Sequence, residues 1–74
     1  MRTRMTANDL AEQIAEEIGA DLGQGEYIEA GVRDAYSGAC PSGYWPPTPG
    51  DLGSFCKFIG YAAGRAHLLA LEEE

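Results

Sequence analysis

One segment interrupts the regular structure of this chain and separates its helical parts along the sequence. All four prolines fall between residues 41 and 49, and the uncharged stretch 35–50 also holds three glycines. Proline removes a backbone donor and fixes φ, while glycine favours turns, so residues 37–48 (SGACPSGYWPPT) are expected to form a loop. Regular structure is therefore expected only before residue 37 and after residue 48.

Residues 6–22 are expected to form the first helix. Thr6 is a suitable N-cap, and Asp9 follows it at the capping-box position. Apolar residues recur at helical spacing and share one arc of the helical wheel, opposite the acidic residues. This arc consists of Ala7, Leu10, Ala11, Ile14, Ala15, Ile18 and Leu22. Gly23 is a natural residue to end the helix, and Gly19 would end it one turn earlier.

A second, shorter helix is expected over residues 26–36. Its apolar side consists of Ile28, Gly31, Val32 and Ala35, and charged residues occupy the other side. The connection to the first helix is short, so the two helices are expected to be neighbours in space.

The third helix is expected over residues 49–72, with Thr48 as N-cap, Pro49 at the first helical position and Asp51 at the third. Its expected inner face consists of Leu52, Phe55, Cys56, Ile59, Ala62, Ala63, Ala66 and Ala70. Further apolar residues lie outside this face, and a helix that is apolar nearly all round is central in its assembly. The sequence thus predicts one all-α domain, a small three-helix bundle with a long central C-terminal helix after a Pro/Gly-rich loop.

Large apolar side chains are scarce in this chain. Of 33 hydrophobic residues, 11 are alanine, and a domain of this size buries only about 60% of its unfolded surface. We therefore expect a homodimer. The expected interface consists of residues of the third helix outside its inner face: Phe58, Tyr61, Leu68 and Leu71.

Three glycines, Gly53, Gly60 and Gly64, fall on one side of the third helix. Glycine inside a helix costs about 1 kcal/mol relative to alanine, so close packing is expected to compensate. Two interpretations remain open: contact with a helix of the same chain, or a groove for a second copy or partner helix.

Composition excludes several classes of function. A net charge of −7 opposes direct binding to nucleic-acid phosphates. No uncharged stretch suits a membrane span, and polar residues follow the basic MRTRM start where a secretory signal needs an apolar run. We therefore expect a cytoplasmic protein in which Cys40 and Cys56 are reduced thiols.

Catalytic and metal-binding patterns are weak. Cys56 and His67 are eleven residues apart on one helix, about 16 Å, so they cannot act together within one chain. The two cysteines and the single histidine have no metal-ligand spacing, and no phosphate-binding glycine motif occurs. We expect no enzymatic activity, no metal and no cofactor.

Two groups of residues are candidates for binding a partner. Asp9, Glu12 and Glu16 form an acidic stripe on the first helix. Glu17 and Asp21 flank this stripe, and it is extended on the next helix by Glu26, Glu29 and Asp34. The stripe is either a solvated face or a surface that recognises a basic protein. Tyr44 and Trp45, next to two prolines, either cover the small core or form an apolar anchor for a partner.

In size, acidity and Ala/Gly-rich composition the chain resembles small accessory proteins of bacteriophages and mobile elements, which include anti-CRISPR and anti-restriction inhibitors. The resemblance is one of type and involves no specific motif. It implies an acidic protein-binding inhibitor that occupies a basic, nucleic-acid-binding surface of a host complex. The alternative is a structural or regulatory helical homo-oligomer without an inhibitory role.

Overall fold

The computed structural model describes residues 3–40, 42, 44 and 46–73. In this part of the chain three helices occur and no strand is present: α1 (Ala7–Ile18), α2 (Leu22–Tyr36) and α3 (Leu52–Glu72). The expected all-α architecture of three helices is confirmed. Within these residues, no helix has the length and apolar character needed to cross a membrane.

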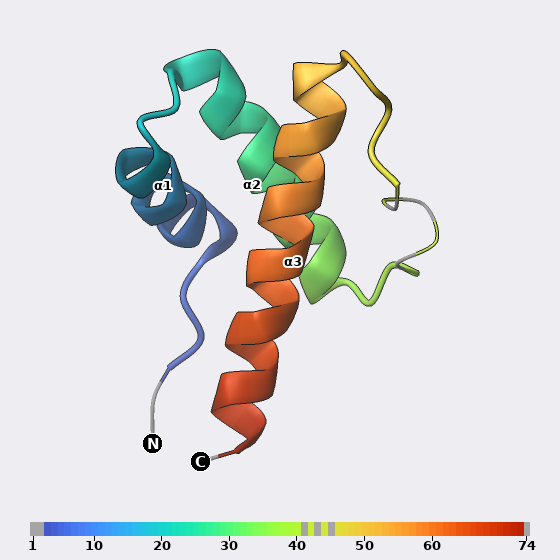
Figure 1. The fold of residues 1–74 in the computed structure, drawn as a ribbon. Coiled ribbons are helices and arrows are strands. Elements are labelled where there is room, and N and C mark those ends of the chain that lie inside the picture. The colour runs from blue at the N-terminus through green and yellow to red at the C-terminus, as the bar shows by residue number, and fades with distance from the viewer. Residues whose placement is uncertain (1–2, 41, 43, 45, 74) are drawn as a thin grey trace.

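The central helix of the fold is α2, not α3. Both α1 and α3 pack mainly against α2, and they contact each other much less. Figure 1 shows α2 behind α3, with α1 to one side. The expectation that the long C-terminal helix lies at the centre is therefore wrong: α3 covers one side of α2 and keeps its own opposite side free of the other helices.

The first helix ends one turn earlier than the expected residue 22. Thr6 caps its start, because the Thr6 hydroxyl accepts a hydrogen bond from the backbone N–H of Asp9 at 3.1 Å. Gly19 ends it with φ +72°, and the N–H of Ala20 donates to the carbonyl of Ala15. Such a left-handed residue satisfies the last carbonyls of a helix and is easiest for glycine. Gly19, the alternative end, is the one that the chain uses.

The second helix begins at Leu22, four residues before the expected start. Asp21 and Gln24 form a reciprocal capping box: each side chain accepts a hydrogen bond from the other residue's backbone N–H, at 2.8 and 3.0 Å. This box satisfies two N–H groups of the first turn. It thereby outweighs the low helix propensity of Gly23 and Gly25, which had suggested a loop.

The third helix begins at Leu52, so the expected start at Pro49 and the cap at Thr48 are wrong. Gly50 has φ +78°, and the N–H of Asp51 donates to the carbonyl of Thr48 at 3.1 Å. Proline followed by a positive-φ glycine is typical of a tight turn, which cannot continue as helix. Asp51 is the actual N-cap and accepts from the N–H of Ser54.

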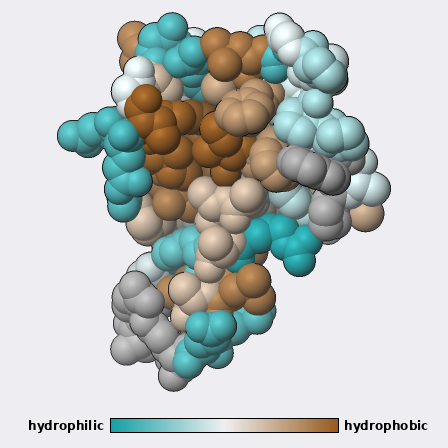
Figure 2. Space-filling view, viewed as in Figure 1, coloured by the Kyte–Doolittle hydropathy of each residue, from teal (hydrophilic) through white to brown (hydrophobic). Residues whose placement is uncertain are grey.

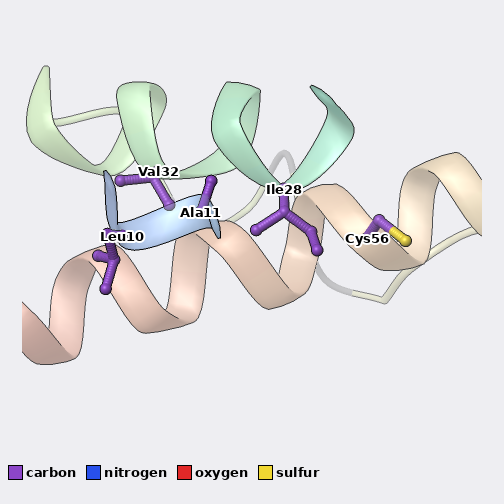
Figure 3. Close-up of a cluster of buried hydrophobic side chains, with 5 residues drawn as sticks. All are labelled: Leu10, Ala11, Ile28, Val32 and Cys56. Carbon is purple, nitrogen blue, oxygen red and sulfur yellow. The ribbon is translucent and has the colours of Figure 1, made fainter. Parts of the chain in front are cut away.

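The core lies between α2 and the two other helices (Figure 3). Leu10 and Ala11 of α1 and Cys56 of α3 surround Ile28 and Val32, which are fully buried. The buried residues of α2 are Ile28, Gly31, Val32 and Ala35. The side of this helix that the sequence predicts as buried is thus confirmed.

Glycines bring α2 and α3 into backbone contact. A Cβ at Gly31 would collide with the carbonyl oxygen of Lys57, and one at Gly60 with the carbonyl oxygen of Ile28. A Cβ at Gly64 would lie 2.8 Å from the Cβ of Ala35. A Cβ at Gly53 would lie 3.0 Å from the ring of Tyr27 of α2. Of the two interpretations of Gly53, Gly60 and Gly64, close contact within one chain therefore holds at all three.

This close contact sets the rotation of α3, and it corrects the predicted inner face. The buried residues of α3 are Cys56, Gly60, Tyr61 and Gly64. Of the eight residues expected to face inward only Cys56 is buried, and Leu52 and Phe55 are 56% and 51% exposed. The glycines of α3 face α2 because only residues without a side chain let the backbone of α2 come this close. The side of α3 with the larger side chains therefore faces outward.

Tyr61 is 3% exposed, so the expectation that this side chain is free to meet a second copy is wrong. Its hydroxyl donates to the carbonyl of Ala39, and its ring stacks on that of Tyr44 at 4.5 Å between centroids. The other residues expected at the interface, Phe58, Leu68 and Leu71, are half-buried within the chain.

Candidate functional site

A groove of about 770 Å³ runs between α1 and α2. Its lining comes from α1, from the short connection and from the first half of α2: Asn8, Ala11, Glu12, Ala15, Ala20, Asp21, Leu22, Gly25, Glu26 and Glu29. Three other hollows of the described chain are smaller, with volumes of about 510, 460 and 300 Å³.

Small residues form the floor of the groove. Ala11 and Ala15 face α2 from α1, and a Cβ at Gly25 would reach only the Cβ of Ala15, at 4.0 Å. Gly19 and the capping box at Asp21 make the turn between the helices tight, so the first turns of α2 lie beside α1. The floor is therefore apolar and shallow.

Carboxylates border this floor. Glu12 on α1, Asp21 at the N-cap of α2 and Glu26 on α2 are exposed. One oxygen of Asp21 already accepts from the N–H of Gln24, but neither Glu12 nor Glu26 has an ion-pair or hydrogen-bond partner among the described residues. Two carboxylates are thus free to receive a cation.

Glu29, which the sequence also predicts as a binding residue, is already engaged. Its carboxylate accepts from the side-chain amide of Asn8 at 2.7 Å and lies 2.9 Å from the guanidinium of Arg33. The side chain of Glu29 is only 21% exposed, whereas that of Arg33 is 67% exposed. Glu29 therefore connects α1 to α2 at one end of the groove and carries little free charge.

The structure brings Glu12 and Glu29 together in the groove, but Asp9 and Glu16 are not part of its lining. Both are exposed on α1 and have no ion-pair partner in the described part of the chain. A role in partner binding for these residues stays a prediction.

Tyr44 lies in a different hollow, which it lines with Tyr27 and Lys57 beside the start of α3. Half-buried and stacked on Tyr61, it covers part of α3. Its expected role as an anchor for a partner stays a prediction. Trp45 lies outside the described residues.

Asp21, which flanks the expected stripe, and Glu26, which extends it on the next helix, complete the groove. Glu26 lies on the charged side of the second helix already in the expected range 26–36. The position of Asp21 depends on the Asp-x-x-Gln capping box with Gln24, which starts α2 at Leu22 and makes Asp21 its N-cap.

Groups with other chemistry do not gather at this groove. Within the described residues, no three His, Cys, Asp or Glu side chains are placed to hold a metal ion. His67 accepts a hydrogen bond from the N–H of Met5, which ties the N-terminal segment to α3. Cys40 and Cys56 are both free thiols, the first exposed and the second buried.

The two thiols have different environments. Hydrogen bonds from Ser42 lower the pKa of Cys40, with a smaller effect of Arg65. Burial raises the pKa of Cys56, and the charge of Asp21 raises it further. The exposed thiol is therefore the more reactive one.

Comparison with known proteins finds no match to this chain: no family model, no curated protein and no solved structure resembles it sufficiently. The geometry of the groove is thus the basis for any functional proposal.

Proposed function

We propose that this protein is a small acidic protein-binding module whose groove between α1 and α2 receives lysine or arginine side chains of a basic partner. The observation that carries the proposal is the combination of an alanine and glycine floor with the free carboxylates of Glu12 and Glu26 at its border. Lysine and arginine have an apolar stem and a charged head, so each part of such a side chain has a matching surface here.

The remaining acidic residues of α1 support the proposal through their longer-range field. Asp9, Glu16 and Glu17 are exposed on the same helix as Glu12. Exposed charges of this kind contribute little to affinity by themselves, but they accelerate the encounter with a basic surface and make it sensitive to salt.

We infer that the partner is a protein surface that otherwise binds nucleic acid. Such surfaces present clustered lysine and arginine, and their affinity for nucleic acid depends on phosphate contacts. An acidic module on that surface blocks it by occupying the same cations. This is the mode of action implied by the resemblance in size and charge to phage-type inhibitors of the anti-CRISPR and anti-restriction class.

The test uses an arginine-rich peptide as probe and two double variants with the same net charge. E12Q/E26Q removes both free carboxylates of the groove, and E72Q/E73Q removes two exposed carboxylates at the far end of α3. We expect the groove variant to bind the peptide about tenfold more weakly, because two exposed ion pairs together contribute about 1.4 kcal/mol. The α3 variant should lose much less affinity. If both variants lose the same affinity for the peptide, binding depends only on the net charge of the protein, and a site in the groove is refuted.

A further inference from the structure

The outer side of α3 bears a regular apolar seam. Its six residues are Leu52, Phe55, Ile59, Ala62, Ala66 and Leu69. Successive members are three, four, three, four and three residues apart, which is the heptad spacing of a helix that packs along another helix. The helix of 21 residues has room for three heptads.

This seam is exposed because the opposite side of α3 faces α2. Leu52, Phe55 and Leu69 are 56%, 51% and 52% exposed, Ala62 and Ala66 are also exposed, and only Ile59 is half-buried. Gly60 and Gly64, the residues in contact with α2, lie across the helix from Ala62. Figure 2, drawn from the side on which α3 lies in front, shows apolar side chains gathered over α3 and between α3 and α1.

The order of large and small side chains makes the seam complementary to itself in one orientation. Consider a second α3 that runs antiparallel, with the midpoints of the two seams side by side. In this register Leu52 meets the partner's Leu69 and Phe55 meets the partner's Ala66. Ile59 then meets the partner's Ala62. Each large side chain is opposite a small one, or leucine is opposite leucine, so the layers fill evenly as close packing requires.

A parallel arrangement lacks this fit. It places Phe55 against its own copy and Ala62 against its own copy, which crowds one layer and leaves a gap in another. It also brings together the two acidic ends after Leu71, where Glu72 and Glu73 are exposed. The antiparallel arrangement separates these ends and puts each beside the start of the partner's α3, where the helix dipole favours negative charge.

We propose that the protein is a homodimer in which the α3 helices of two copies pack antiparallel along this seam. The interface differs from the one expected from the sequence, because Tyr61 is buried inside each chain. In this dimer the groove between α1 and α2 stays outside the interface of each copy. The proposal does not depend on the function of that groove.

The first test is the mass of the full chain in solution across a range of concentrations. We expect light scattering to give twice the chain mass of 7.9 kDa at high micromolar concentration. A62E puts a charge at the centre of the seam and should give a monomer, whereas Q13E adds the same charge on the exposed side of α1 and should stay dimeric. Circular dichroism should show equal helix content in all three, because Ala62 and Gln13 are exposed in the single chain. A monomeric wild type, or an A62E variant that dimerises like the wild type, would overturn the proposal.

The second test addresses orientation and does not depend on the A62E variant. In a background carrying C40S, which removes the exposed native thiol, L52C and L69C are made separately and treated with a short thiol cross-linker. We expect covalent dimers mainly when the two variants are mixed, since position 52 lies beside the partner's position 69. Cross-linking of each variant with itself, without enrichment in the mixture, would contradict the antiparallel seam.

Discussion

Gly31 of α2 and Gly60 of α3 lie where these two helices cross, and each occupies a place in which the other helix's backbone leaves no room for a side chain. The space beside Gly31 is filled by the carbonyl of Lys57 and the amide of Tyr61, and that beside Gly60 by the carbonyl of Ile28. This contact determines which side of α3 is buried, and it therefore determines which side is left for a partner.

Substitution of Gly60 tests this contact. G60A adds a methyl group against backbone, which cannot move aside as a side chain does, so we expect the free energy of unfolding to fall by about 3 kcal/mol. The matched control is G25A, because a Cβ at Gly25 meets only the Cβ of Ala15 at 4.0 Å. Alanine is the better helix former, so G25A should raise stability by up to about 1 kcal/mol. Urea denaturation followed by circular dichroism measures both, and equal stability of G60A and wild type would contradict the close crossing.

The two cysteines should differ in reactivity. Cys40 is exposed and hydrogen bonds with Ser42 lower its pKa, whereas Cys56 is buried and its pKa is raised. We expect iodoacetamide to modify Cys40 in the native protein and Cys56 only after denaturation. Mass spectrometry of the peptides identifies the site, and rapid modification of Cys56 in the folded protein would show that the core is open.

Tyr36 should make the fold sensitive to alkali. Its hydroxyl donates to the carbonyl of Met5 at 2.8 Å. Burial raises the pKa of Tyr36, although the guanidinium of Arg4 opposes this effect. The unfolded chain therefore ionises first, from about pH 10, and the free energy of unfolding should fall as the pH rises until the folded Tyr36 ionises too.

The control for this effect is Y36F. At neutral pH the loss of the hydrogen bond should lower the free energy of unfolding of Y36F by about 1 kcal/mol. Between neutral pH and pH values above about 10, the free energy of unfolding of Y36F should fall less than that of the wild type. If both proteins show the same pH dependence, groups other than Tyr36 cause the decrease of the free energy of unfolding at alkaline pH.

Glu29 should contribute to stability more than its neighbour Glu26. E29Q keeps the side chain that accepts from Asn8 but removes the charge next to Arg33, whereas E29A removes both interactions. We expect E29A to lower the melting temperature by a few degrees and E29Q by less, since a single exposed ion pair contributes less than about 1 kcal/mol. E26A, at an exposed site without such partners, should change it little. An equal effect of E26A and E29A would indicate that Glu29 does not join the two helices.

The sequence predicts the buried side of a helix correctly only where the helix has one apolar side and one charged side. The buried side of α2 is predicted correctly, because its charged residues leave only one apolar side. On α3, apolar residues occur all round, and the size of the side chains predicts that the side with Phe55 and Ile59 is the buried one. The glycines decide the orientation instead, since the backbone contact at Gly60 depends on a neighbouring helix that the sequence of α3 alone does not describe.

The candidate groove is only partly predictable for a similar reason. Glu12 and Glu29 fall on neighbouring helices in any arrangement in which these helices are adjacent. The same holds for Glu26, which the expected helix already contains. Asp21 joins them because the capping box starts α2 early, against the low helix propensity of two glycines. The pairing of Glu29 with Asn8 and Arg33 is not among the predictions from the sequence. Its contact with Asn8 depends on the distance between α1 and α2, which is set by tertiary packing.

The most direct measurement of the proposed function is competition between this protein and duplex DNA for an arginine-rich peptide. Fluorescence anisotropy of labelled DNA reports its release from the peptide as protein is added at low salt. We expect the wild type and E72Q/E73Q to release the DNA at similar concentrations, and E12Q/E26Q to need about ten times more protein. Failure of the wild type to release the DNA, or release by E12Q/E26Q at the concentration of the wild type, would contradict an acidic groove that occupies nucleic-acid-binding cations.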